Sequence, residues 1–186
     1  MIDRIDPPVR RRAYGGDKIN RVPDPWRTNS VHYITIVLGS ILPWFIIADV
    51  MPIAPPLGFM FFLGWRLMRP GLMPLWAGVP LGAFDDLFSG QPFGSAIFLW
   101  SLTMIALEVI ETRFPWRGFW LDWFTAGLGI ALYIVACMFI SGATISLSLF
   151  AMIAPQILFS ILLYPIVARL IARADGFRLS RARRIG

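Results

Sequence analysis

The chain has 186 residues, of which 57% are apolar and 15% charged, and its mean hydropathy is +0.67. Soluble domains contain about 45–50% apolar residues even when glycine is counted, so this composition excludes a disordered chain and disfavours a soluble globular domain. The net charge of +6 is confined to a few segments and does not indicate nucleic-acid binding. The single cysteine, Cys137, excludes an internal disulfide framework and a cysteine-based metal cluster. The sequence therefore predicts an all-α, polytopic integral membrane protein.

Six apolar stretches in chain order are candidate membrane helices, each of which needs about 20 mostly apolar residues. The candidates are 31–48, 53–68, 71–88, 93–111, 119–140 and 145–168. The second and third are the most interrupted, because Arg66, Arg69 and Pro70 separate them. The short connections predict one six-helix bundle over residues 31–172, with basic cytoplasmic tails at 1–30 and 173–186.

The basic residues give the orientation of these six spans. All 17 lie in the N-terminal tail, in the connections after the second and fourth spans, or at the C-terminal end. The opposite loops, at 49–52, 89–92 and 141–144, contain none. Because basic residues concentrate on the cytoplasmic side, six spans with both termini in the cytoplasm are predicted. The N-terminal tail either lies against anionic lipid or docks a cytoplasmic partner, and both interpretations stay open.

Few side chains could carry out catalysis. The only histidine, His32, lies at the inner edge of the first span and is expected to be an interfacial polar residue, although a serine–histidine or cysteine–histidine pair would have to use it. Asp85 and Asp86 are expected near the outer surface, where water is close. Adjacent helical residues point about 100° apart, so this pair cannot share a proton as aspartyl protease carboxylates do. We therefore predict no catalytic, cofactor-binding or metal-ligating residues.

The remaining carboxylates near the spans are expected to be structural. Glu108 lies one helical turn from Glu111 on the same face and deeper in the membrane, which makes it the best candidate for a buried ion pair with Arg66. Glu111 and Asp122 are expected near the inner surface, within reach of the arginines between the fourth and fifth spans.

Small residues in the third span suggest close helix packing. Gly78 and Gly82 have the Gly-x-x-x-Gly spacing that lets a neighbouring helix approach. Asp86, Gly90 and Gly94 continue the same step of four into the following turn.

The middle of the chain carries an extended pattern, P-x9-W-x4-P-x11-G-x3-D-x3-G-x3-G, formed by Pro55, Trp65, Pro70, Gly82, Asp86, Gly90 and Gly94. Pro165 follows near the end of the last span, before a basic tail. These features resemble the rod shape-determining protein MreD family of bacterial inner-membrane proteins. The chain departs from that pattern at Asp85, where the family more often has an apolar residue.

The resemblance implies a non-enzymatic subunit of the cell-elongation machinery. Such a subunit associates with MreC in the membrane and, through it, with MreB, RodA and the elongation transpeptidase. The resemblance also implies that Gly90 and Gly94 shape a turn and that Asp86 accepts hydrogen bonds from the first amides of the fourth span, near Gly94 and Ser95. In the alternative interpretation, Asp86 contacts a periplasmic or membrane segment of a partner protein.

Two other classes of function remain. A substrate-binding membrane subunit of a small-solute transporter, of the vitamin type, would need a polar pocket, and few polar residues lie between mid-depth and the outer face. These are Gln91, Thr103, Thr144, Ser146 and Ser148. An intramembrane hydrolase would have to use His32 and Asp86.

Overall fold

The computed structural model describes residues 25–46, 54–113, 118–142 and 147–179. Every regular element in these ranges is helical, which confirms the all-α prediction. The elements are α1 (Pro25–Ile46), α2 (Leu57–Met68), the short 3₁₀ helix η2 (Leu75–Ala77), α3 (Gly78–Asp86), α4 (Ser95–Arg113), α5 (Phe119–Ile140) and α6 (Leu147–Leu179). Residues 1–24, which contain most of the predicted N-terminal tail, lie outside the described ranges.

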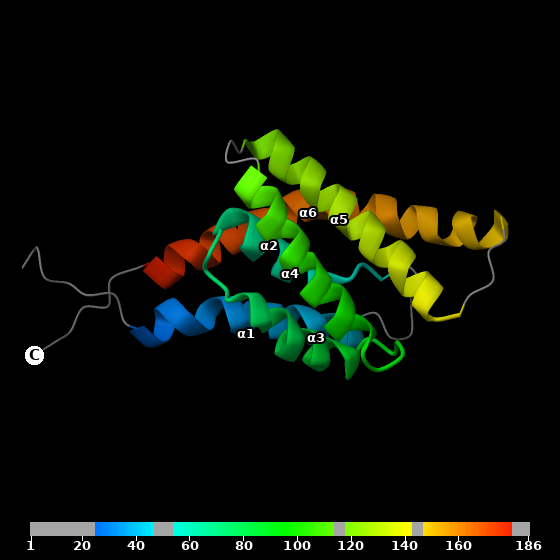
Figure 1. Cartoon of the computed structure of the whole chain (residues 1–186), viewed down its shortest axis with the longest axis horizontal. Coiled ribbons are helices and arrows are strands. Elements are labelled where there is room, and N and C mark those ends of the chain that lie inside the picture. Colours follow the sequence, from blue (N-terminus) through cyan, green and yellow to red (C-terminus); the bar gives the residue numbers. More distant parts are fainter. Residues whose placement is uncertain (1–24, 47–53, 114–117, 143–146, 180–186) are drawn as a thin grey trace, which may run out of the picture.

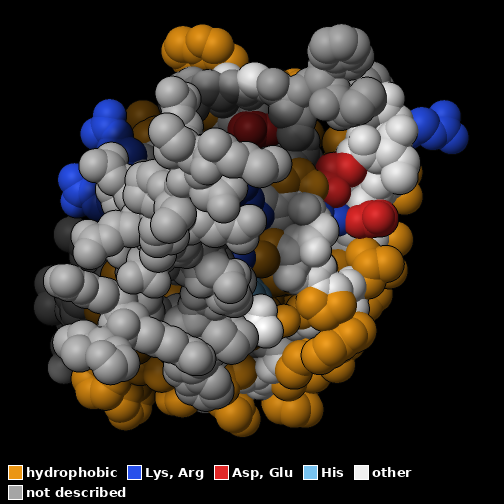
Figure 2. Space-filling view, turned by 90° about the vertical axis from the view of Figure 1, so that its left-hand side faces the viewer, with side chains coloured by type: hydrophobic (Ala, Val, Ile, Leu, Met, Phe, Trp, Pro, Cys, Tyr) orange, Lys and Arg blue, Asp and Glu red, His pale blue; other side chains and the backbone are white. Residues whose placement is uncertain are grey.

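The helices give the bundle two ends with different chemistry. We call the end at which α2, α4 and α6 finish the Arg66 end, and the end at which α1, α3 and α5 finish the Asp85 end (Figure 1). Figure 2 looks onto the Arg66 end, where basic side chains are visible at both sides, acidic ones mainly on the right, and apolar ones along the lower edge.

Three helices are long and apolar enough to cross a membrane, among the residues that the structure describes: Ser95–Arg113, Trp120–Ile140 and Ile153–Leu179. Large apolar side chains on them point outward, including Phe98, Phe124 and Leu162, each at least 60% exposed. An apolar outer face of this kind suits a lipid environment, because in water it would be a large unpaired hydrophobic surface.

The predicted boundaries are accurate for some spans and wrong for others. Helix α5 has the predicted bounds, and α4 is displaced by two residues. Helix α6 continues to Leu179, so residues 173–179 of the expected C-terminal tail are helical.

The second and third predicted spans are too long. Helix α2 has 12 residues and α3 has 9, so each rises less than about 20 Å, whereas the hydrocarbon core is about 30 Å thick. Pro70 and Pro74 cannot continue a helix, and Gly71 between them adopts a positive φ of 76°. Apolar residues continue through this turn because Met73 is buried in the core, and this made the segment resemble a span.

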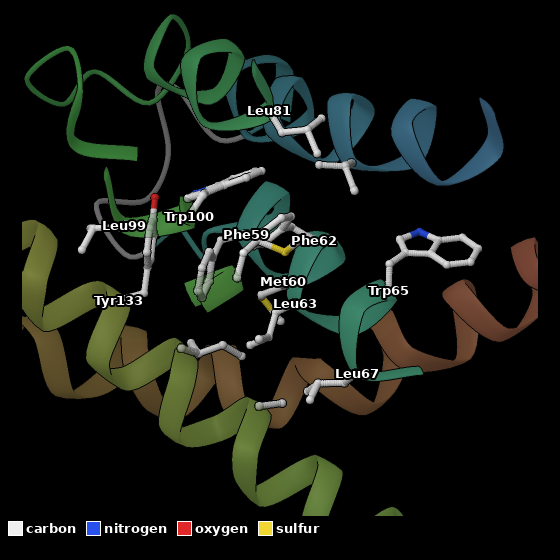
Figure 3. Packing of buried hydrophobic residues seen from close by; sticks show 14 of the residues in the cluster. Phe59, Met60, Phe62, Leu63, Trp65, Leu67, Leu81, Leu99, Trp100 and Tyr133 are labelled. Carbon is white, nitrogen blue, oxygen red and sulfur yellow. The ribbon is translucent and has the colours of Figure 1, made fainter. Parts of the chain in front are cut away.

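Helix α2 lies at the centre of the bundle. Phe59, Met60, Phe62, Leu63 and Trp65 on it are each at most 1% exposed. The ring of Phe59 stacks on Tyr133 of α5 at 4.0 Å, and the ring of Phe62 stacks on Trp100 of α4 at 4.6 Å (Figure 3). Because other helices enclose α2, little of its backbone is exposed to lipid, although the helix is too short to cross a membrane.

Candidate functional site

Asp86 connects the end of α3 to the start of α4. Its side chain is buried, and its carboxylate accepts hydrogen bonds from the backbone N–H groups of Gly94 and Ala96, both at 2.8 Å, and of Ile97 at 3.3 Å. The Ser95 hydroxyl also donates to it, at 3.1 Å. The first amides of a helix have no partners within the helix and carry partial positive charge, so a carboxylate there caps the helix. This confirms the expected hydrogen bonds to the first amides of the fourth helix.

Gly90 and Gly94 occupy backbone conformations that other residues rarely adopt. Their φ angles are 67° and 99°, and both lie in the turn between α3 and α4. A side chain at either position would strain the turn that brings the first turn of α4 onto Asp86.

Gly78 and Gly82 form the contact surface between α3 and α4. A Cβ atom on Gly82 would lie 2.7 Å from the Ala96 carbonyl oxygen, and one on Gly78 would lie 3.0 Å from backbone atoms of Ser101. The two backbones therefore approach as closely as the Gly-x-x-x-Gly spacing predicts. Together with Asp86, Gly90 and Gly94, these glycines form one continuous unit, which we call the α3–α4 clasp.

The other residues singled out in the sequence lie outside the clasp. Trp65 is fully buried in α2, and its indole N–H donates to the Thr35 hydroxyl on α1 at 2.8 Å. Pro70 is exposed in the turn that follows α2. Pro165 is half-buried within α6.

An ion-pair cluster around the buried Arg66 lies at the Arg66 end. Arg66 is 1% exposed, and its guanidinium pairs with Glu108 and, at 2.8 Å, with Glu111. The predicted pairing of Arg66 with Glu108 is confirmed, but the Glu108 side chain is 48% exposed, so the expected burial holds for the arginine alone. Glu111 is expected to lie within reach of the arginines between the fourth and fifth spans, but in the structure it pairs with Arg66 of α2. A buried guanidinium without such partners would be costly, so both acidic residues of α4 serve this one cation.

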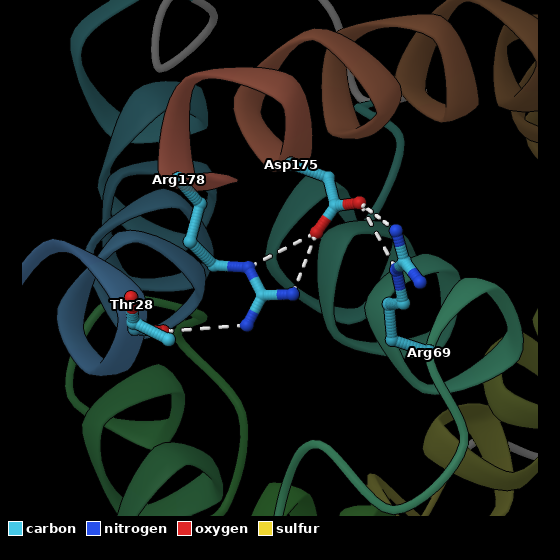
Figure 4. A network of polar contacts seen from close by, with 4 residues as sticks. All are labelled: Thr28, Arg69, Asp175 and Arg178. Atoms are coloured by element: carbon cyan, nitrogen blue, oxygen red, sulfur yellow. Dashed lines mark hydrogen bonds and ion pairs between the residues drawn. The ribbon is translucent and has the colours of Figure 1, made fainter. Parts of the chain in front are cut away.

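A second network at the same end was not predicted. Asp175 of α6 accepts hydrogen bonds from Arg69, at 2.6 and 3.0 Å, and from Arg178, at 3.0 Å (Figure 4). Arg178 also donates to the Thr28 carbonyl oxygen of α1 at 3.4 Å. The network joins α1, α6 and the turn after α2. Its only sequence signal is an acidic residue three positions before Arg178 in an otherwise basic segment.

A family model described as rod shape-determining protein MreD matches residues 25–173, from the start of α1 into the last turns of α6. The chain belongs to the MreD family. No curated protein and no solved structure matches it. MreD proteins are membrane proteins that determine rod shape, so this chain is a rod shape-determining membrane protein, in agreement with its apolar helices. The α3–α4 clasp, the Arg66 cluster and α2 all lie within the part that matches the MreD model.

Two expectations about polar residues of this MreD-family chain are wrong. His32 is 3% exposed and packs against the rings of Tyr33 and Trp65, so it belongs to the core and is not interfacial. Asp85 and Asp86 lie at one end of the bundle, but their side chains are only 8% and 6% exposed, so the expected contact with outside water is wrong for them. The turn between α3 and α4 and the neighbouring helices cover them.

The sequence also missed a polar cavity at the Asp85 end, which we call the Asp85 cavity. It has a volume of about 370 Å³, and its polar lining includes Ser40, Asp85, Gln91, Tyr133 and Gln156. Of the polar residues expected to be available, Gln91 lines this cavity and Thr103 donates to the Leu99 carbonyl oxygen of its own helix. Thr144 and Ser146 lie outside the described residues, and the structure does not describe the side chain of Ser148.

The scarcity of polar groups that was expected at this depth is therefore wrong for the assembled bundle. Helices α1, α3, α5 and α6 contribute one of the named polar residues each, the turn after α3 contributes Gln91, and the fold brings them together. The sequence shows these lining residues only as isolated polar residues in apolar runs, such as Ser40 and Gln156. That they meet in one cavity cannot be predicted without the fold.

Proposed function

We propose that this chain is a non-enzymatic scaffold subunit of the bacterial cell-elongation complex, which supports peripheral peptidoglycan synthesis. It binds MreC in the membrane and, through MreC, is linked to MreB, RodA and the elongation transpeptidase. The family match over residues 25–173 is the observation that carries this proposal, because it covers nearly all of the described helices.

We further propose that the bundle crosses the bacterial inner membrane six times, with both termini in the cytoplasm. Successive helices run in opposite directions between the two ends, as six crossings require (Figure 1). The arginines of the described segments lie toward the Arg66 end, where the positive-inside rule favours the cytoplasm: Arg27, Arg66, Arg69, Arg113, Arg169, Arg173 and Arg178. The short helix α2 fits this topology because packed side chains of the other helices enclose it, and Met73 of the turn that follows it is buried in the core.

A scaffold role agrees with how the ionisable groups are used. Asp86 caps α4, Glu108 and Glu111 neutralise Arg66, and Asp175 binds two arginines. Each of these contacts fixes one helix relative to another. An enzyme would need such groups directed at a substrate, whereas here they hold the bundle in one arrangement.

Copurification tests the proposal. A tagged copy replaces the chromosomal gene, membranes are extracted in mild detergent, and mass spectrometry identifies the bound proteins. We expect MreC together with RodA or the transpeptidase, and we expect depletion of the chain to turn rods into spheres. A second multi-pass protein of the same membrane, with the same tag and abundance, serves as the control.

Recovery of an ATPase and a membrane coupling subunit in place of MreC would contradict the scaffold and support the transporter alternative. Normal rod shape after complete depletion would also contradict it.

A further inference from the structure

The Asp85 cavity has the size and lining of a ligand site. Its volume of about 370 Å³ falls within the range of small-molecule pockets, which is roughly 300–1,000 Å³. Its polar lining comes from different helices and one turn: Ser40 from α1, Asp85 from α3, Gln91 from the following turn, Tyr133 from α5 and Gln156 from α6. A second hollow, of about 210 Å³, shares Gln91, Tyr133 and Gln156 with it.

The carboxylate of Asp85 is buried beside this cavity without a cation. No arginine, lysine or histidine of the described segments forms an ion pair with it, although its side chain is only 8% exposed. Its neighbour Asp86 differs, because backbone amides of α4 satisfy that carboxylate. Burial of a carboxylate without a cation is costly even where hydroxyl groups donate to it, so a cation bound in the cavity would be stabilised beside Asp85.

Ser40 and Tyr133 place hydroxyl groups beside the Asp85 carboxylate. Both hydroxyls are within hydrogen-bonding reach of it, and both residues line the cavity. These neutral donors leave the Asp85 carboxylate without a counter-ion in the described part of the chain.

Gly58 of α2 keeps the space between the Ser40 and Asp85 side chains open. A Cβ atom at that position would lie 2.1 Å from Ser40 Oγ and 2.7 Å from Asp85 Oδ1. Any larger residue would therefore have to push into both polar groups.

The other polar lining groups, which include Ser89 and Gln91, are hydroxyls and amides that can accept hydrogen bonds as well as donate them. Gln156 donates one amide N–H to the Ala54 carbonyl oxygen at 2.7 Å, which leaves its side-chain oxygen as an acceptor and its second N–H as a donor. The ring of Tyr133 is held by stacking on Phe59, and its hydroxyl points toward the side on which α3 lies (Figure 3). One carboxylate surrounded by neutral oxygens suits a cation with several N–H donors.

The chain does not supply that cation from nearby sequence. The segments 47–53, 87–94 and 141–146, which connect helices at the Asp85 end, contain no lysine or arginine. The positive charges of the described helices lie toward the opposite end, where Arg66 and Arg69 are already paired.

We propose that the Asp85 cavity binds a primary ammonium group, with Asp85 as its counter-ion and Ser40, Tyr133 and Gln156 as further acceptors. The group belongs either to a small soluble amine or to the ethanolamine headgroup of a membrane lipid. The proposal is independent of the scaffold role, because it depends only on the chemistry of this cavity.

The test uses the full chain in nanodiscs of phosphatidylcholine, whose quaternary headgroup has no N–H donor. In one arm, ethanolamine is titrated and its binding is measured by calorimetry. In the other arm, phosphatidylethanolamine is mixed into the nanodisc, and native mass spectrometry counts the lipids that stay bound to the protein. We expect saturable binding of one amine in one of the two arms, which identifies its source.

Matched variants connect the binding to the cavity. Asp85→Asn keeps the shape of the side chain and removes its charge, so binding should weaken by about tenfold or more. Ser40→Ala should weaken it less, because the charge remains. Glu108→Gln removes a carboxylate at the opposite end and should leave binding unchanged. Circular dichroism and gel filtration confirm that each variant is folded.

The proposal is overturned if neither arm shows saturable binding. It is also overturned if Asp85→Asn binds as tightly as the original chain, or if Glu108→Gln weakens binding to the same extent.

Discussion

Asp85 and Asp86 are adjacent on α3, yet their carboxylates have opposite surroundings. Asp86 receives three backbone N–H groups and one hydroxyl from the start of α4, whereas Asp85 faces a cavity. The difference follows from the helical rotation between adjacent positions, which turns one side chain toward α4 and the other toward α1, α2 and α5.

Replacing Asp86 by alanine should destabilise the protein by about 2 kcal/mol, because it leaves buried donors at the start of α4 without a partner. Thermal unfolding in detergent, followed by circular dichroism, measures the loss. Ser89→Ala in the same exposed turn is the control and should change stability by less than about 0.5 kcal/mol. Equal unfolding temperatures for the two variants would contradict the capping role.

The Asp86→Asn variant separates the structural role from the alternative of a partner contact. It keeps an acceptor oxygen for the cap and loses the charge. If Asp86→Asn folds and still copurifies with MreC, the charge of Asp86 is not needed for binding that partner.

At the scale of elements, the α3–α4 clasp depends on backbone proximity. Gly82 leaves no room for a methyl group against the Ala96 carbonyl, whereas a Cβ atom on Gly127 of α5 would meet Ile161 of α6 at 3.6 Å, an ordinary contact. The same substitution should therefore have opposite effects at these two positions.

Gly82→Ala should destabilise the fold by about 1–3 kcal/mol, because the helices must separate to admit the methyl group. Gly127→Ala should be neutral or stabilising by up to about 1 kcal/mol, because alanine favours the helix and the space is available. Unfolding curves of both variants in the same detergent measure the contrast. A Gly82→Ala variant as stable as Gly127→Ala would show that α3 and α4 are not in tight contact.

Contacts between residues close together in the sequence could be predicted, whereas contacts between residues far apart in the sequence could not. The Asp86 cap joins residues eight to eleven positions apart and could be anticipated from the turn between them. The contact between Arg69 and Asp175 spans 106 positions, and nothing in either local segment specifies the other. Long apolar runs located α4 and α5, because such runs in the membrane are helices over their full length.

Hydropathy predicted spans that are too long where apolar residues outside a helix pack in the core. The turn after α2 stays apolar because Met73 fills the core, so its composition does not distinguish it from a span. The polar lining of the Asp85 cavity could not be predicted because α1, α3, α5 and α6 each contribute only one polar residue to it. These lining residues are close together only in the folded bundle, and no single segment of the sequence contains them all.

At the scale of the whole molecule, the two ends of the bundle should face different compartments. The test replaces Cys137, the only cysteine, by alanine and introduces Ser141→Cys after α5 or Gly118→Cys before it. Both new positions are exposed, and a Cβ atom on Gly118 meets nothing within 4 Å.

A membrane-impermeant maleimide should label Ser141→Cys in cells whose outer membrane has been opened, and it should label Gly118→Cys only after the inner membrane is disrupted. Gel shift of the labelled protein measures both reactions. The reverse pattern would contradict the proposed orientation, and equal labelling of both positions in cells with an intact inner membrane would contradict a crossing by α5.

Helix α6 is held at both ends of the bundle. Gln156 bonds to Ala54 at the Asp85 end, while Asp175 and Arg178 bind Arg69 and the carbonyl of Thr28 at the Arg66 end. Its 33 residues rise about 50 Å, more than the thickness of the hydrocarbon core. One continuous helix therefore couples the two ends of the bundle, so that a shift of its C-terminal segment is felt at the contact with Ala54, and Pro155 and Pro165 are the points within it where the backbone hydrogen bonding is interrupted.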